Sequence, residues 1–373
     1  MVKKLKIYII KNKQQKLQGG MIMNNENNFS IINIKNIKDN IEYIKNKYNK
    51  YNYYMAVVKS NCYGLGYKEI SKNIEDQVSY FVVTTLDEAI NIRKIINKPI
   101  LCLGIIKEEN LKICKKNNIT ITIPNYEYLK QIKSKNLKNI KVHIKINTGM
   151  NRLGVKTKEE FNKTYNYLTK NNIKIEGIYT HIYEATNKTN SKKQVKQFEK
   201  ITEDIDLNKI KIIHLFASDA TKNIEKPKYV NGIRMGINMY GLGEEELKSC
   251  IQVTSEITQI NTLNKGETLG YNGTFKADKD NTKIAVIPLG YYNGITRNFK
   301  GSYVYINNKK YQIVGNICMN MMFIKIDNTI KIGDSVYIIK DNTHIKEISK
   351  HINTIPYEII CNIDNKIPRK HIY

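Results

Sequence analysis

The chain has 373 residues, and 41% of them are hydrophobic, which predicts an ordered core and excludes a disordered chain. Its formal net charge of +27 is spread almost evenly and comes with an excess of Lys, Asn, Ile and Tyr, which AT-rich codons favour, so it does not by itself indicate nucleic-acid binding. The 6 cysteines form no Cys-x-x-Cys pair and no apolar run is long enough to span a membrane, which predicts a cytoplasmic protein without a disulfide framework, metal site, nucleic-acid partner or membrane partner.

The first part of the chain is polar and basic. We expect residues 1–22 to be a disordered extension, because Met21 and Met23 offer alternative starts. Alternating apolar residues predict a strand over Ser30–Lys35, and apolar residues at helical spacing predict a helix over Asn36–Lys50.

Strand-like runs then recur at the interval of βα units. They are Tyr54–Lys59, Tyr80–Thr85, Ile100–Gly104, Ile119–Ile123, Val142–Asn147, Ile175–His181, Ile210–Phe216 and Ile233–Tyr240. Amphipathic stretches between them predict helices over Leu86–Ile96, Tyr126–Lys135, Lys158–Thr169 and Lys192–Asp204. Eight strands alternating with helices predict a (β/α)8 TIM-type barrel. The alternative is a doubly wound open sheet, but no Gly-x-Gly-x-x-Gly follows the first strand.

The pattern changes after about residue 245. Short strands are predicted over Ile251–Ile260, Lys283–Pro288, Tyr303–Ile306, Tyr311–Val314, Met322–Ile326 and Ser335–Ile339, and only Thr343–Ile352 has a helical pattern. The sequence therefore predicts a barrel over residues 23–245 and a mostly β domain over residues 246–373.

The stretch from Tyr54 to Tyr67 places one lysine, Lys59, at the end of a buried strand. Such a lysine is costly to desolvate unless its amine is used. In a chain so rich in lysine, a surface lysine that caps the strand is the ordinary interpretation. The alternative is a lysine that binds an aldehyde at the mouth of a barrel, with Tyr63 placed to contact a phosphate.

Further unusual residues follow the ends of the predicted strands. Arg152 follows the fifth strand, His181 ends the sixth, Ser218 follows the seventh, and Arg234 and Gly236 lie on the eighth. Chemistry in a (β/α)8 barrel takes place at the carboxyl ends of the strands, and phosphate is often held after strands seven and eight. Together these residues predict a site for a phosphorylated aldehyde, pyridoxal phosphate, bound through the lysine of the first strand.

Seven motifs extend this interpretation over most of the chain, from about Asn28 to Arg369. They are AVVKSNCYGLG at 56–66, HIKINTGMNRLGV at 143–155, GIYTH at 177–181, RMGINMYGL at 234–242, LGYNGTF at 269–275, IPLGYYNG at 287–294 and VGNICMN at 314–320. In this order and spacing the sequence resembles the alanine racemases, barrel-type pyridoxal-phosphate enzymes. The resemblance implies a homodimer with shared active sites that interconverts L-alanine and D-alanine and supplies D-alanine for peptidoglycan.

The resemblance also implies two bases. Lys59 binds the cofactor and then acts on one face of the substrate, and Tyr271 of the partner subunit acts on the opposite face. Racemisation needs both, because a proton leaves one side of Cα and another arrives on the other side. A phenol needs cationic neighbours to act as a base near neutral pH, and Arg152 and Arg234 supply that charge.

The remaining roles that the resemblance implies concern binding. Arg152 and the main chain of Met319 bind the substrate carboxylate, and Arg234 faces the pyridine nitrogen. His181 is expected near the pyridine ring. The residues expected to hold the phosphate are Tyr63, Ser218 and the backbone amides of Gly236 and Ile237.

Four residues stand apart from these shared roles. Lys145 matches a lysine that many family members carbamylate, which positions the arginine that follows it. Asn316 and Asn320 replace the usual arginine and aspartate, and are expected to alter the entrance to the site. Asn365 replaces a tyrosine that contacts the phosphate and narrows the pocket, as in the serine-racemising branch, so L-serine is an alternative substrate.

Two other interpretations remain at this point. A non-catalytic pyridoxal-phosphate protein resembles the barrel alone and lacks the β domain and an equivalent of Tyr271. A basic nucleic-acid binder is suggested only by the net charge of +27.

Overall fold

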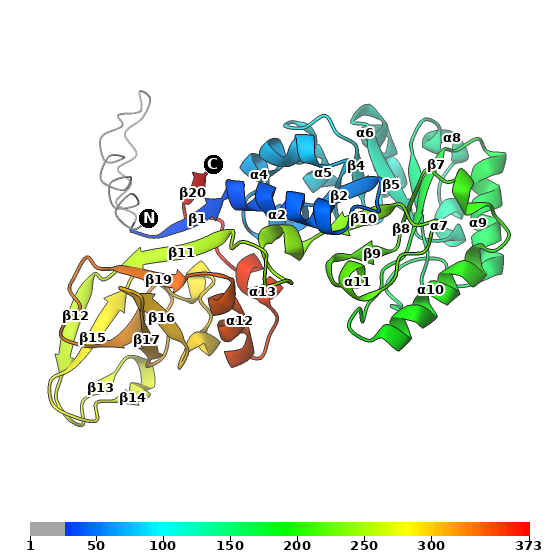
Figure 1. Cartoon of the computed structure of the whole chain (residues 1–373). Coiled ribbons are helices and arrows are strands. Elements are labelled where there is room, and N and C mark those ends of the chain that lie inside the picture. Colours follow the sequence, from blue (N-terminus) through cyan, green and yellow to red (C-terminus); the bar gives the residue numbers. More distant parts are fainter. Residues whose placement is uncertain (1–26) are drawn as a thin grey trace.

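The computed structural model describes residues 27–373, so the extension predicted over residues 1–22 lies outside the described residues. The described chain forms a barrel and a mostly β unit, which lie side by side in Figure 1. None of the helices between residues 27 and 373 has the length and apolar character needed to cross a membrane.

The barrel is a parallel sheet with the strand order β8-β7-β6-β5-β4-β3-β2-β10-β9. Its strands are β2 (Tyr53–Val57), β3 (Tyr80–Val83), β4 (Ile100–Cys102), β5 (Ile119–Ile123), β6 (Val142–Lys145), β7 (Ile175–Tyr179), β8 (Ile212–His214), β9 (Phe216–Ala217) and β10 (Gly232–Met235). The two ends of this order, β8 and β9, are separated in the chain only by Leu215, so the sheet closes on itself. Most of these strand residues are buried, as expected where helices cover a parallel sheet. The predicted (β/α)8 barrel is confirmed.

Helices surround the barrel sheet in Figure 1. The α-helices of this unit are α2 (Ile34–Lys47), α3 (Lys59–Tyr63), α4 (Tyr67–Ile74), α5 (Leu86–Arg93), α6 (Leu111–Lys116), α7 (Tyr126–Lys130), α8 (Ser134–Leu137), α9 (Lys158–Lys170), α10 (Lys188–Thr202) and α11 (Ser218–Asn223). Short polar side chains cap several of them, as Thr157 does for α9.

The second unit is built on a sheet with the order β12-β15-β18-β17-β16-β19-β11-β1-β20. Its strands are β1 (Phe29–Asn33), β11 (Ile251–Glu256), β12 (Gln259–Leu263), β15 (Thr282–Ile287), β16 (Tyr303–Ile306), β17 (Lys309–Val314), β18 (Met322–Ile326), β19 (Ser335–Ile339) and β20 (Arg369–Ile372), with the separate pair β13 (Thr268–Leu269) and β14 (Phe275–Lys276). The predicted mostly β unit is confirmed. Strand β1 precedes the barrel in the chain, but it pairs with β11 and β20 of this sheet.

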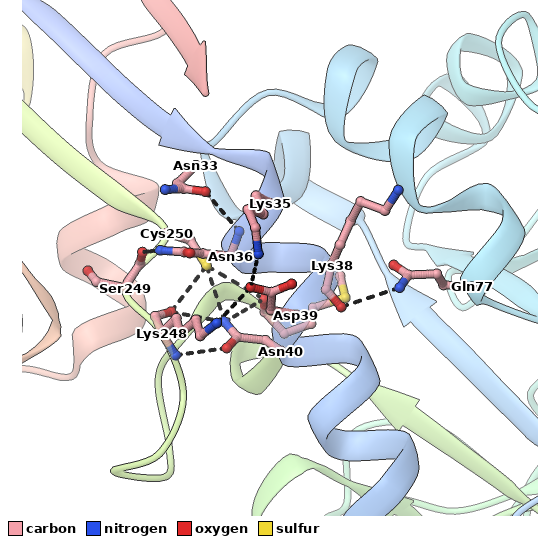
Figure 2. A network of polar contacts seen from close by, with 11 residues as sticks. Asn33, Lys35, Asn36, Lys38, Asp39, Asn40, Gln77, Lys248, Ser249 and Cys250 are labelled. Atoms are coloured by element: carbon pink, nitrogen blue, oxygen red, sulfur yellow. Dashed lines mark hydrogen bonds and ion pairs between the residues drawn. The ribbon is translucent and has the colours of Figure 1, made fainter. Parts of the chain in front are cut away.

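Polar contacts hold helix α2 against the segment that leaves the barrel, as Figure 2 shows. The side chain of Asn40 donates to the carbonyl of Lys248 at 2.9 Å and accepts from its backbone N–H at 2.8 Å. Asn36 donates to the carbonyl of Ser249 at 2.7 Å, and the carboxylate of Asp39 lies 2.7 Å from the Lys248 ammonium. These contacts fix the path of the chain from the barrel into β11.

Several predicted boundaries are wrong, and most errors lie where a strand ends at the carboxyl side of the barrel. Lys59 does not end β2 but begins α3, and the strand predicted over Ile233–Tyr240 stops at Met235 because the chain turns at Gly236 into a 3-10 helix, η5 (Ile237–Tyr240). After β2 and after β10 the backbone leaves the sheet earlier than predicted and lies along the strand ends.

The other corrections divide or add elements. The runs over Ile210–Phe216 and Ile251–Ile260 each form two strands, and the helix over Tyr126–Lys135 is divided into α7 and α8. The second unit contains α13 (Pro356–Cys361) besides α12 (Asn342–His351). A proline at the start of α13 is tolerated because the first helical N–H needs no partner.

Candidate active site

Lys59 lies at the carboxyl end of β2, half-buried at the rim of the barrel. Burial lowers the pKa of its amine, and the nearby charge of Arg152 lowers that pKa further. A lysine in this setting releases its proton more readily than a surface lysine, which suits a nucleophile or a base.

The residues after Lys59 form a left-handed turn. Ser60, Asn61, Cys62 and Tyr63 all have φ between 52° and 55°. This conformation costs roughly 1–2 kcal/mol for each L-residue, so the surroundings must hold it. The carboxylate of Glu88 accepts the backbone N–H of Ser60 at 2.5 Å, as well as two N–H groups at the start of α5. Glu88 therefore ties this turn to the neighbouring strand end.

The turn directs Tyr63 toward the end of β10. A Cβ atom added at Gly236 would lie 3.2 Å from the Tyr63 hydroxyl and 3.6 Å from Ser218 Oγ. The space beside Gly236 is thus faced by two hydroxyl groups and by backbone that no side chain covers. We call Tyr63, Ser218, Gly236 and Ile237 the cradle. All four were predicted to hold phosphate, and the structure brings them together.

Arg234 lies on β10, two residues before Gly236, and is 4% exposed. Its guanidinium donates to the carbonyls of Thr180, His214 and Leu215 at 2.9, 2.6 and 3.1 Å. Burial lowers its pKa to about 10, which leaves the side chain charged at neutral pH. It also lies 3.4 Å from Nδ1 of His181, so these two predicted residues are in contact.

A row of buried side chains continues from Arg234 into the barrel. His214 Nδ1 lies 2.7 Å from the Arg234 guanidinium, and His214 Nε2 lies 2.9 Å from His143 Nδ1. Because arginine only donates, neutral His214 carries its proton on Nε2, and neutral His143 then carries its own on the nitrogen facing Glu176, at 3.7 Å. This row fixes the orientation of Arg234.

Sequence reasoning missed His143, His214 and Glu176 as parts of the site. The feature of the sequence that could have identified them is that each is a polar residue within an otherwise apolar predicted strand. The structure shows that the side chains are 0–1% exposed, where a polar residue needs a partner.

Lys145, at the end of β6, is the other buried basic side chain at this rim. It is 8% exposed, and its ammonium lies 4.5 Å from the centre of the Tyr179 ring. Burial, followed by the charges of Arg234 and Arg152, places its pKa well below the ordinary value for lysine. Within residues 27–373 it forms no ion pair with a carboxylate.

The pKa of His181 is affected by the charged side chains around the rim. Burial lowers its pKa to about 3, and the charges of Arg234, Lys145, Arg152 and Lys59 add to this effect. The imidazole is therefore neutral at physiological pH. These four basic side chains are therefore close enough to His181 to act on its pKa.

Asn365 meets the loop that follows Lys59. Its side-chain oxygen accepts hydrogen bonds from Asn61 at 2.8 Å and from Arg369 at 2.7 Å. Arg369 also donates to the carbonyl of Gly64 at 2.6 Å. The structure thus brings the predicted specificity residue to the strand end that carries the lysine.

Neither Tyr271 nor Met319 shares a hydrogen bond with a rim residue within residues 27–373. Both lie in the β unit, with Tyr271 71% and Met319 53% exposed. The backbone of Tyr271 accepts a hydrogen bond from Asn316 at 3.0 Å. Figure 1 shows β13 and β14, which flank Tyr271, at the end of the β unit that lies away from the barrel.

The fold and the rim together define a barrel enzyme with a half-buried lysine of lowered pKa at its strand ends and a β unit that presents exposed side chains. Residues 32–244 match the family model described as alanine racemase, N-terminal domain, and residues 250–371 match the one described as alanine racemase, C-terminal domain. The chain belongs to the alanine racemase family and is a racemase by that membership.

Individual relatives can be aligned with this chain over most of its length. The alanine racemase of Staphylococcus epidermidis is 30% identical over 341 residues, which cover 86% of this chain and 88% of that protein. The alanine racemase of Lactococcus lactis is 34% identical over 330 residues, covering 84% and 89%. Among solved structures, alanine racemase of Clostridium difficile superposes with a TM-score of 0.86 at 28% identity, covering 93% of this chain and 96% of that one.

Proposed function

We propose that this chain interconverts L-alanine and D-alanine with pyridoxal phosphate as its cofactor. The observation that carries the proposal is the half-buried Lys59, whose pKa is lowered, on the same rim as the cradle. The test is to follow the optical rotation or circular dichroism of purified enzyme with each enantiomer of alanine. If reactions started from L-alanine and from D-alanine reach the same mixture of the two enantiomers, the proposal is supported. If neither enantiomer is converted, the proposal is contradicted.

The residues present fit the cofactor. The cradle offers two hydroxyl groups and open backbone to a phosphate, and Lys59 offers an amine to an aldehyde. Arg234 would face the ring nitrogen, with His181 close by. When bound, pyridoxal phosphate acidifies the Cα–H of the amino acid attached to it. The chain's own residues hold the cofactor, orient the amino acid and move the proton.

Two side chains each carry out the proton transfer on one face of the substrate. Lys59 exchanges a proton with Cα on one face, and Tyr271 of the partner subunit exchanges one on the other face. The exposure of Tyr271 and Met319 supports a homodimer, because exposed side chains of the β unit are available to a partner subunit. Arg152 and the main chain of Met319 bind the substrate carboxylate. We infer that the D-alanine formed serves peptidoglycan synthesis.

Lys145 is expected to carry a carbamate. A neutral lysine amine attacks CO2, forms an N–C bond and releases one proton, and the lowered pKa of Lys145 increases the fraction of its amine that is neutral. The resulting anion would face Arg152 and orient it toward the substrate. At a fixed concentration of dissolved CO2, occupancy should rise as the pH rises through the lowered pKa, because protonated lysine does not react.

The measurement is carbon-13 NMR of the enzyme in labelled bicarbonate. We expect one protected carbamate signal in the wild type and none in Lys145→Met. The exposed Lys68→Met is the matched control and should keep the signal. A wild-type spectrum without a carbamate signal would show that Lys145 acts as an unmodified amine.

L-serine is the alternative substrate, and Asn365 is the observation that favours it. Its side-chain oxygen is occupied by Asn61 and Arg369, and its amide nitrogen has no hydrogen-bond partner in the described part of the chain. This leaves a donor that a substrate hydroxyl can use. Asparagine is also smaller than the tyrosine it replaces in the family.

Asn365→Tyr is expected to lower kcat/KM for serine relative to alanine by about 10-fold or more, because the pocket narrows and a hydrogen bond is lost. The measurement is kcat/KM for both amino acids in the wild type and the variant. Asn365→Ala separates the two causes, since it keeps the space and removes the amide. Negligible serine turnover that neither change affects would exclude the alternative.

A further inference from the structure

A buried amide beside the cradle is not used by the proposed function. Asn238 follows Ile237 in η5 and is 1% exposed. Its Oδ1 accepts hydrogen bonds from Ser218 Oγ at 2.8 Å and from the backbone N–H of Met239 at 3.0 Å. Its Nδ2 has no hydrogen-bond partner among residues 27–373. Buried donors almost always have a partner, so this one points to a group outside the chain.

One orientation of the amide is favoured by its surroundings. The backbone N–H of Met239 can only donate, and it is shared between the Gly236 carbonyl at 3.2 Å and the side-chain oxygen of Asn238 at 3.0 Å, which favours the orientation with the oxygen toward Met239. The nitrogen is bonded to the same carbon as this oxygen, and the oxygen lies 2.8 Å from Ser218 Oγ. Nδ2 is therefore two covalent bonds from the atom that contacts the Ser218 hydroxyl, which forms one side of the cradle.

We propose that Asn238 is a further phosphate-binding residue. Its Nδ2 donates to the anion in the cradle, and its Oδ1 holds Ser218 beside that anion. This inference rests on the proposed function, in which the anion is the phosphate group of the cofactor.

The chemistry of the cradle supports this role. A phosphate group offers only acceptors. Tyr63 supplies one O–H donor, whereas the single proton of Ser218 is available to the phosphate only when it leaves Asn238 Oδ1, which accepts it in this structure. Burial raises the pKa of Tyr63, so its hydroxyl keeps that proton. Asn238 adds two donors without adding charge. Because these three side chains are neutral, loss of one donor is expected to weaken binding measurably.

A different partner for Nδ2 is a water molecule near Asp219. A Cβ atom added at Gly243 would lie 3.9 Å from Asp219 Oδ1 and 4.0 Å from Asn238 Cβ, so the two side chains approach the same region. In that arrangement a change at Asn238 would not depend on whether the ligand carries a phosphate. The experiment is designed around this difference.

The test compares pyridoxal phosphate with pyridoxal, which has the aldehyde and no phosphate, as ligands of the apoenzyme. Kd is measured from the visible absorbance that appears when Lys59 binds either aldehyde. Asn238→Ala should raise the Kd for pyridoxal phosphate by about 10- to 100-fold, the usual range for loss of a hydrogen bond to a charged group. The Kd for pyridoxal should not change. Asn238→Asp keeps the shape, replaces the donors by acceptors and should weaken the phosphate form further.

The matched control is Asn231→Ala, at the other end of β10, where both amide atoms of Asn231 have backbone partners. This substitution should not change the ratio of the Kd values for pyridoxal phosphate and pyridoxal. Phosphorus-31 NMR of bound cofactor should shift in Asn238→Asp and not in the control.

Equal weakening of both ligands, or unchanged affinity in both Asn238 variants, would overturn the inference. If the wild type binds neither aldehyde through Lys59, the proposed function fails, which is a separate result.

Discussion

Lys59→Ala is expected to remove the visible absorbance of the lysine–cofactor link and to lower kcat by at least about 10³-fold. The variant loses both the amine that binds the cofactor and one of the two proton-transfer groups, and general acid–base catalysis alone contributes about 10²–10⁴-fold. The measurement is the absorbance spectrum of the purified variant, with racemisation of alanine assayed on the same sample.

Lys68→Ala is the matched control, because Lys68 is an exposed lysine in the next helix, α4. It should keep the colour and the activity of the wild type. A Lys59→Ala enzyme that keeps both would show that another residue binds the cofactor, and the assignment of the site would be wrong.

Tyr271→Phe is expected to keep the absorbance and to lower racemisation by about 10²–10⁴-fold. Only the phenolic hydroxyl is lost, and Tyr271 lies in the β unit, away from the cradle of its own chain. In heavy water, the variant should exchange the Cα hydrogen of one enantiomer through Lys59 without converting it into the other. Proton NMR of both enantiomers measures this difference.

Tyr303→Phe is the control for this change, because Tyr303 is another exposed tyrosine of the β unit. Its racemisation should match the wild type. If Tyr271→Phe loses exchange with both enantiomers equally, Tyr271 is not the base for a single face.

Mixing the two inactive variants tests whether the site is shared. In random hybrids of Lys59→Ala with Tyr271→Phe, about a quarter of the sites should combine an intact Lys59 with an intact Tyr271 of the partner subunit. Recovery of about a quarter of the activity supports a shared site. No recovery, with hybrids shown to form, would place both residues of a site in one chain.

The barrel could be predicted from the sequence because its strands are buried runs at regular intervals, a local signal. The rim residues could be predicted because strand ends in this fold meet at one face, so position in the chain gives position in space. Lys59, Arg234 and the cradle follow from this rule.

Other parts of the site depend on contacts between distant segments, which one sequence does not reveal. The left-handed turn after Lys59 depends on Glu88 of another βα unit, and Asn365 is held by Asn61. The role of Asn238 depends on Ser218, which is 20 residues away in the chain. Each of these residues is ordinary in the sequence and becomes informative only through its partner.

The pairing of β1 with β11 and β20 has a consequence for synthesis on the ribosome. β1 leaves the ribosome before the barrel, whereas its partners follow after more than 200 further residues have been made, because its register pairs Ser30 with Val253 and Arg369. The barrel is in effect an insertion between neighbouring strands of one sheet. That sheet cannot be complete until β20 has been made, and Arg369 of β20 also donates to the Gly64 carbonyl, so the loop after Lys59 gains this contact only when the chain is nearly finished.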